Sequence, residues 1–144
     1  MITIGKIEIK DLEELSVLFE ELSGSITNYD KMILNYNWMK SNPDYILLGA
    51  KYNNELVGTI MGIICKDIVG ECKPFIVIEN VIVKGNMRGK GIGKKLMNEI
   101  ERIGREKECY YSIFVSSVYR KEAHKFYESI GYSLDFVQGF KKYL

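Results

Sequence analysis

The chain has few of the residues that build the most easily recognised functional sites. It contains three cysteines, Cys65, Cys72 and Cys109, with no CxxC pair, and His124 is its single histidine. Structural zinc sites and disulfide frameworks need paired or clustered ligands of these types, so the sequence argues against both. We therefore expect no metal, and thiols that are buried or unreactive.

Long apolar runs and an excess of one charge are also missing. No stretch approaches the roughly 20 apolar residues that span a bilayer, and residues 1–6 lack the basic-then-apolar plan of a signal peptide. Lysine and arginine number 20 against 19 aspartates and glutamates, so no global field favours nucleic acid or a membrane surface. We expect a cytoplasmic protein whose charged binding sites are local.

What the chain does contain is enough apolar material for one ordinary core. Of its 144 residues, 47% are hydrophobic and only two are proline, so we predict a single domain over residues 1–144. The hydrophobic periodicity predicts the order β-α-α-β-β-β-α-β-α-β, which describes one mixed α/β sheet flanked by helices. The expected strands cover residues 2–9, 45–52, 56–65, 75–83, 110–115 and 134–142, and the expected helices cover 11–22, 30–42, 93–108 and a short segment ending at Gly131.

Two local signals support these boundaries. Asp11 and Glu14 have the spacing of a capping box at the start of the first helix. The polar residues 53–55 separate two β-favouring runs and predict a hairpin.

The segment after the most strand-like run, Phe75–Val83, carries the strongest chemical signal. It reads Arg88-Gly89-Lys90-Gly91-Ile92-Gly93 and continues into Lys94 and Lys95. The start of a helix exposes unpaired N–H groups with partial positive charge, which favours an anion. Glycines allow the backbone to approach a phosphate closely. The segment therefore fits a pyrophosphate, although a tight turn beneath a solvated basic helix would have the same composition.

Other nucleotide motifs share glycines but fit this segment poorly. A P-loop needs GxxxxGK[ST], whereas here Lys95 follows Gly93-Lys94 and Arg88 replaces the first glycine. A dinucleotide fingerprint needs GxGxxG near the start of the fold, whereas the three glycines here give GxGxG after several strands.

Two motifs together resemble the GNAT superfamily of N-acetyltransferases. Arg88-x-x-Gly91-x-Gly93 after a strand is similar to its acyl-CoA signature, and Ala123–Tyr132 is similar to its late helix and following strand. The resemblance implies a GNAT-like fold, with a central mixed and mostly antiparallel sheet, a splayed parallel pair of strands, and about four flanking helices. It also implies that the pantetheine arm of acetyl-CoA lies between the strands at 76–83 and 110–115.

The activity that the resemblance implies is transfer of the acetyl group of acetyl-CoA to a primary amine of a small molecule or peptide. The amine attacks directly in a ternary complex and no metal takes part. A different class of protein, a non-catalytic acyl-CoA-binding or regulatory module, would keep the same fold without turnover.

Two residues are candidates for the acid and the base of this reaction. The resemblance implies Tyr127 as the acid near the thioester sulfur, whereas packing against Phe126 and Ile130 would also explain it. Glu79 is the only acidic residue inside the apolar strand that leads to the turn, and a desolvated carboxylate there would suit proton acceptance. A glutamate paired with lysine, or water acting as the base, would be the alternative.

The cofactor-binding residues implied by the resemblance act largely through the backbone, as at Val81 and Val83. One departure from the superfamily is Arg120, which stands where many members have an asparagine and could instead reach the CoA phosphates. The full set is Val81, Ile82, Val83, Arg88, Gly89, Lys90, Gly91, Ile92, Gly93, Lys94 and Arg120.

The acceptor side is less defined. We expect the first two helices and the loop at 23–29 to build the acceptor pocket, where Tyr29, Tyr36 and Trp38 are either lining or core residues. Aminoglycosides, polyamines, amino acids and protein amines all remain open as acceptors. The apolar run at 136–140 could extend a sheet across a homodimer interface.

Overall fold

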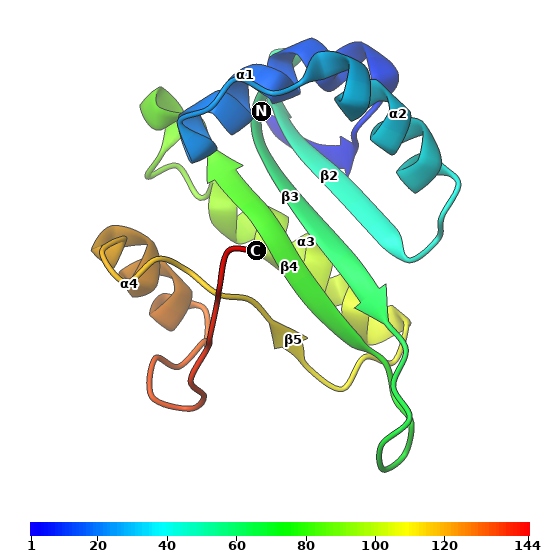
Figure 1. The fold of residues 1–144 in the computed structure, drawn as a ribbon. Coiled ribbons are helices and arrows are strands. Elements are labelled where there is room, and N and C mark those ends of the chain that lie inside the picture. Colours follow the sequence, from blue (N-terminus) through cyan, green and yellow to red (C-terminus); the bar gives the residue numbers. More distant parts are fainter. The chain divides into compact units, whose positions relative to one another are not determined.

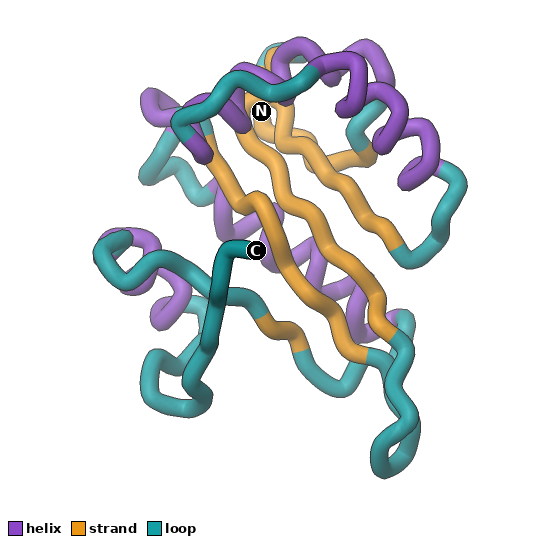
Figure 2. Tube along the Cα trace, in the orientation of Figure 1, coloured by secondary structure: helices purple, strands orange, loops and turns teal.

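The computed structural model describes residues 1–144, which form two compact units, Met1–Ile113 and Phe114–Leu144. The first unit contains a five-stranded sheet in the order β1-β2-β3-β4-β5, with helices packed on it (Figures 1 and 2). Its strands are β1 Ile2–Lys6, β2 Tyr45–Tyr52, β3 Glu55–Cys65, β4 Phe75–Val83 and β5 Ser112–Ile113. Its helices are α1 Leu12–Ser23, α2 Tyr29–Lys40 and α3 Ile92–Glu106, with short 3-10 helices η1 Ile9–Asp11 and η2 Gly85–Met87. None of the helices is both long and apolar enough to cross a bilayer.

All neighbouring strands pair antiparallel except β4 and β5, which are parallel. The predicted mixed and mostly antiparallel sheet is therefore confirmed. The hairpin between β2 and β3 is also confirmed, because Asn53 and Asn54 both have positive φ and Tyr52 pairs with Glu55. Asparagine tolerates this left-handed region better than most residues, which is what a two-residue hairpin turn demands.

Helix α3 packs closely on one face of the sheet because β3 carries glycines there. A Cβ on Gly58 would lie 3.2 Å from Leu96 Cδ1 and 3.3 Å from Ile92 Cγ2, and one on Gly62 would lie 2.9 Å from Ile100 Cδ1. These residues are spaced four positions apart and therefore share one face of the helix. The sheet therefore fixes the start of α3 through Gly58 and Ile92.

Helices α1 and α2 cover the opposite face (Figure 1). Leu12, Leu15 and Leu18 of α1 form a buried cluster there with Leu56 and Ile82 of the sheet. The helix predicted at residues 11–22 is confirmed, and its buried leucines share one face.

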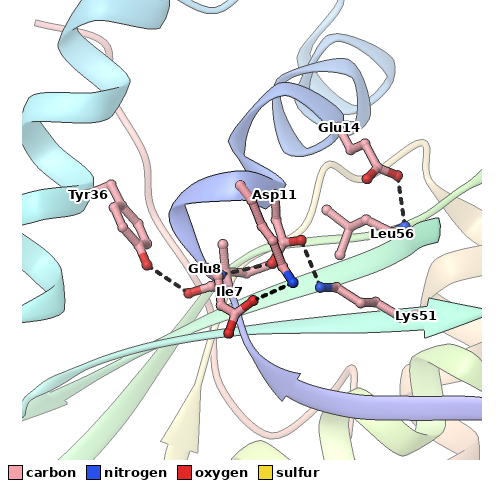
Figure 3. Close-up of polar contacts among 8 residues, drawn as sticks. Ile7, Glu8, Asp11, Glu14, Tyr36, Lys51 and Leu56 are labelled. Carbon is pink, nitrogen blue, oxygen red and sulfur yellow. Dashed lines mark hydrogen bonds and ion pairs between the residues drawn. The ribbon is translucent and has the colours of Figure 1, made fainter. Parts of the chain in front are cut away.

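The polar start of α1 differs from the predicted capping box. Asp11 and Glu14 do not cap the helix together; each instead binds a different part of the sheet region (Figure 3). The buried Asp11 carboxylate accepts a hydrogen bond from the Glu8 N–H at 2.8 Å and pairs with Lys51 at 2.7 Å. Glu14 accepts from the Leu56 N–H at 2.9 Å. Asp11 thus forms a capping box with Glu8 around η1 and not with Glu14, while the contacts with Lys51 and Leu56 attach the start of α1 to β2 and β3.

The second unit contains one helix, α4 Lys121–Ser129, and no strand. The short helix predicted before Gly131 is confirmed, and Gly131 follows it with φ of 101°. The strand predicted at residues 134–142 is wrong, because those residues form no ladder, and Phe136 and Phe140 are exposed. A β-favouring sequence becomes a strand only when another strand supplies hydrogen-bond partners.

The cysteines are free thiols. Cys72 is exposed, whereas Cys65 and Cys109 are half-buried. Burial raises the pKa of Cys109, which disfavours its reactive thiolate form. The expectation of burial therefore does not hold for Cys72.

Candidate active site

The most distinctive feature of the first unit is an edge of β4 that lacks a strand partner along most of its length. Strand β5 pairs only with Ile76 and Val77, whereas β4 continues to Val83. The sequence predicted a longer strand at 110–115, but only Ser112 and Ile113 form it. The two parallel strands therefore meet at one end of β4 and share no pairing beyond it.

The backbone groups on this free edge can be assigned by alternation along the strand. The Ile76 N–H donates toward β5, to the Tyr111 carbonyl at 3.0 Å, so the Ile78 groups face the same side. At the other end, the Lys84 N–H donates to Val57 of β3 at 2.8 Å, which turns the groups of Val81 and Val83 toward the free edge. Both valines were predicted to offer backbone groups to the cofactor, and that role stays a prediction.

A β-bulge interrupts β4 between these two ends. The register passes from Met61 opposite Glu79 to Thr59 opposite Ile82, so Asn80 and Val81 together face the single residue Ile60. Asn80 takes the positive φ of 55° at the bulge. The extra residue reverses the side-chain alternation, which is a general property of bulges.

Glu79 lies immediately before this bulge and is exposed. Its neighbour Ile78 is buried with Ile76 on the α3 side of the sheet, so the Glu79 side chain leaves from the face that α1 and α2 occupy. The desolvated setting considered for Glu79 in the sequence is therefore absent, although its place on the strand is the expected one.

The glycine-rich turn follows β4 and η2 and leads directly into α3. Gly89 and Gly91 have φ of 77° and 79°, and a Cβ on either would meet nothing within 4 Å. The turn therefore needs glycine for its backbone angles and not for space. The first helical bond of α3 runs from the Lys95 N–H to the Gly91 carbonyl at 3.1 Å, so the preceding amides of residues 92–94 have no partner within the helix.

Exposed cations surround these amides. Lys90, Lys94 and Lys95 are all exposed around the start of α3. Together with the helix dipole they make this end of α3 favourable for an anion. The Ile92 side chain is buried and anchors the turn on the sheet. Its N–H is one of the three amides, at residues 92–94, that have no partner within the helix.

Arg88 is already engaged by other groups. Its Nε donates to the Val83 carbonyl at 3.0 Å, and a terminal nitrogen pairs with Glu21 of α1 at 3.2 Å. The sequence predicted Arg88 as a cofactor ligand and gave no sign of Glu21, which lies 67 residues away and belongs to the polar side of an amphipathic helix. No local pattern could have revealed this contact.

The aromatic residues proposed for the acceptor side have different environments. Tyr36 is buried and donates to the Ile7 carbonyl at 2.9 Å, so it is a core residue (Figure 3). Burial, with the nearby Glu8 and Asp11 carboxylates, raises the pKa of Tyr36. Trp38 is 56% exposed and lies edge-on to Tyr45, with 5.2 Å between ring centroids. Trp38 therefore keeps a surface available to a ligand, and Tyr36 does not.

In the second unit, Tyr127 lies in a cluster of aromatic rings. Its ring centroid is 4.5 Å from that of Phe114 and 6.5 Å from that of Tyr132. Burial raises the pKa of Tyr127, and the charge of Arg120 opposes this shift. The phenol is thus neutral around pH 7, as an acid must be. His124 shares a hydrogen bond of 3.2 Å with Ser116.

These features agree with the comparison of the sequence with known families. The pattern of the Acetyltransferase (GNAT) family matches residues 9–132, a span that includes β4, the glycine-rich turn and α4. The chain belongs to this family of acetyltransferases.

Individual relatives extend the comparison. The "Probable glucosamine 6-phosphate N-acetyltransferase" of Drosophila melanogaster is 27% identical over 107 residues, which cover 73% of this chain and 48% of that protein. The chain thus spans about half the length of this relative. The glucosamine-6-phosphate N-acetyltransferase of Arabidopsis thaliana is similar in structure, with a TM-score of 0.85, 26% identity and 99% of each chain covered.

A second similar structure contains a ligand. AAC(6')-Iy in complex with the bisubstrate analog CoA-S-monomethyl-acetylneamine has a TM-score of 0.81 and 19% identity, with 100% of this chain and 99% of that chain covered. At this identity the likeness shows the shared fold. The predicted GNAT-like fold is therefore confirmed from sequence and from structure.

Proposed function

We propose that the protein transfers the acetyl group of acetyl-CoA to a primary amine of a small molecule or peptide. The observation that supports this most is the free edge of β4, which is followed, after the short η2, by the glycine-rich turn at the start of α3. An extended chain with amide groups can pair with the edge, while a pyrophosphate can bind the free amides of the turn. Acetyl-CoA contains both parts side by side, because its amide-bearing pantetheine arm is joined directly to its pyrophosphate.

The cofactor-binding set proposed for this chain follows the same division. Val81 offers its backbone groups from β4 and Val83 offers its N–H, because the Val83 carbonyl already accepts from Arg88. The turn from Gly89 to Gly93 offers amides to the pyrophosphate. Lys90 and Lys94 add charge from exposed positions, and Arg120 is proposed as a further phosphate contact.

In the proposed reaction, the amine nitrogen attacks the carbonyl carbon of the thioester. A C–N bond forms, the C–S bond breaks, and the nitrogen loses a proton to a base while the leaving thiolate gains one from an acid. We propose Glu79, directly or through water, as the base and Tyr127 as the acid. Backbone N–H groups on the β4 edge would stabilise the negative charge that develops on the carbonyl oxygen.

The first test asks which nucleotide-containing ligand stabilises the protein against thermal unfolding. Acetyl-CoA at about 100 times its dissociation constant is expected to stabilise the protein by about 2.7 kcal/mol, observed as a raised melting temperature. ATP and NAD at equal concentration serve as controls. A shift with ATP or NAD and none with acetyl-CoA would contradict the proposal.

Turnover is measured separately, by release of free CoA thiol with a panel of amines. Two similar proteins are named for glucosamine 6-phosphate, so that amine belongs in the panel beside aminoglycosides, polyamines and peptides. Binding of acetyl-CoA without thiol release from any amine would favour the non-catalytic alternative.

Glu79→Gln tests the proposed base. It is expected to lower kcat about tenfold, less than the usual 10²–10⁴ of a general base because water at this exposed position can still accept the proton. The dissociation constant of acetyl-CoA should not change. Glu71→Gln, in the exposed loop before β4, is the matched control. An unchanged kcat in Glu79→Gln would remove this residue from the mechanism.

A further inference from the structure

Arg88 connects three parts of the first unit. It lies directly after η2, donates from Nε to the last residue of β4, and pairs through a terminal nitrogen with Glu21. Glu21 lies in the last turn of α1, three residues before the left-handed Gly24 that ends the helix. The guanidinium is therefore held from two sides, by a strand end and by a helix end.

Glu21 also lies close to Gly85, the first residue of η2. Its Oε1 atom lies 3.0 Å from the position that a Cβ on Gly85 would take. Gly85 does not have positive φ, so the absence of a side chain there serves the close approach of the carboxylate and not an unusual backbone angle. The carboxylate that pairs with Arg88 thus also lies beside Gly85, at the other end of the segment 85–88.

A second ion pair holds the same junction from the other side. Lys84, the residue after β4, pairs with Glu55 in the hairpin between β2 and β3. The Glu55 carboxylate raises the pKa of Lys84, and the charges of Glu14 and Glu21 contribute to this shift. The two cations that flank η2 therefore have partners on different elements, Lys84 on the hairpin and Arg88 on α1.

The Arg88–Glu21 pair contributes little to stability. The two side chains are 56% and 38% exposed, and solvent largely screens an ion pair at this exposure. What the pair does fix is the orientation of the Arg88 side chain. Arginine has many rotamers, and the hydrogen bonds to Val83 and Glu21 select one that points toward β4 and α1. The backbone between Val83 and Gly89 is held with it.

We propose that Glu21 is a positioning residue for the cofactor site, acting through Arg88 to hold the glycine-rich turn in its binding conformation. This inference rests on the proposed function, since the bound anion is the pyrophosphate of acetyl-CoA. It also means that the end of α1, which leads into the loop expected on the acceptor side, is mechanically linked to the cofactor turn.

Whether Glu21→Gln weakens or tightens acetyl-CoA binding separates a positioning role of Glu21 from a purely electrostatic one. Glu21→Gln removes a negative charge near the anion site, which by electrostatics alone would tighten acetyl-CoA binding. A positioning role predicts the opposite, an increase of about fivefold in the dissociation constant measured by titration calorimetry. Glu20→Gln, one residue earlier on the same exposed helix turn, is the matched charge control. Tighter or unchanged binding in Glu21→Gln would overturn the proposal.

A double-mutant cycle tests whether Glu21 acts through Arg88. The Glu21→Gln/Arg88→Gln double variant is expected to bind acetyl-CoA no more weakly than Arg88→Gln alone. Once the Arg88 side chain is gone, Glu21 has no guanidinium left to orient. Additive losses would mean that Glu21 acts independently, and the proposal would fail.

Gly85→Ala provides an uncharged version of the same test. The new Cβ would displace the Glu21 carboxylate by a few tenths of an ångström without altering any charged group. Weaker binding of acetyl-CoA is expected in the wild-type background and no further change in the Glu21→Gln background. An equal loss in both backgrounds would contradict a role for the carboxylate.

The free protein supplies a readout that does not depend on acetyl-CoA. Amide hydrogen exchange in residues 84–93 is expected to be faster in Glu21→Gln than in Glu20→Gln, with the melting temperatures nearly equal. If the wild type does not bind acetyl-CoA at all, the proposed function fails while this measurement still decides the structural part. Equal exchange rates in the two variants would overturn the positioning role.

Discussion

Gly91→Val is expected to weaken acetyl-CoA binding by about 30-fold or more while leaving the chain folded. Gly91 precedes the first residue of α3 with φ of 79°. The left-handed region costs an ordinary L-residue about 1–2 kcal/mol, and a β-branched side chain costs more. If the backbone leaves this region to avoid the cost, the amides of the turn move away from the positions that bind the anion. A loss of about 1.4 kcal/mol in binding free energy corresponds to a tenfold increase in the dissociation constant. Titration calorimetry measures the dissociation constant.

A series at this position identifies the cause. Nothing lies within 4 Å of the Cβ position, so side-chain volume alone should have little effect. Gly91→Asn, which tolerates positive φ, is expected to bind acetyl-CoA better than Gly91→Val although the two side chains are similar in size. Equal losses in both variants would point to volume in the bound state and against the backbone explanation.

Tyr127→Phe is expected to lower kcat about 100-fold, at the lower end of the usual contribution of a general acid. The dissociation constant of acetyl-CoA should stay within about twofold, because phenylalanine keeps the ring contacts with Phe114 and Tyr132 and removes only the hydroxyl. Steady-state kinetics with an accepted amine gives kcat, and calorimetry gives the binding constant.

Tyr132→Phe is the matched control, since it removes a hydroxyl from the same ring cluster. Its kcat should stay near that of the wild type. The raised pKa of Tyr127 adds a pH condition: a phenol is active as an acid in its neutral form, and raising its pKa extends that form to higher pH. Activity should therefore not fall through ionisation of Tyr127 below about pH 10. A joint loss of kcat and acetyl-CoA affinity in Tyr127→Phe would indicate a packing role.

The sequence predicted the central strands well because their signals are local. The runs that became β2 and β4 have the predicted ends, at Tyr45–Tyr52 and Phe75–Val83, since apolar β-branched residues are bounded there by turn residues. The glycine-rich turn was equally readable, because positive φ at Gly89 and Gly91 requires that residue type. Short-range chemistry decided all of these features.

The failures share the opposite cause. The run at 134–142 favours a strand locally, yet no neighbouring strand pairs with it. Asp11 and Glu14 have cap spacing, but Asp11 caps η1 through Glu8 and pairs with the distant Lys51, and Glu14 binds the distant Leu56 N–H. The ion pair between Glu21 and Arg88 has no sequence signature at all, because an exposed glutamate on a helix has many ordinary explanations. The exposure of Glu79 likewise depends on which other segments cover its strand. The alternation of apolar and polar residues within the strand carries no information about those segments.

The bulge in β4 has a consequence for how this strand can vary in evolution. Before it, Ile78 faces α3; after it, Ile82 joins the cluster under α1, although the two are an even number of residues apart. Deleting Asn80 would reverse which face of the sheet each later side chain of β4 points to, so Ile82 would leave its cluster. The backbone groups of Val81 and Val83 would likewise turn away from the free edge. A substitution along this strand therefore changes one side chain at a time, whereas a change in its length between Glu79 and Ile82 would change the facing of every residue after it.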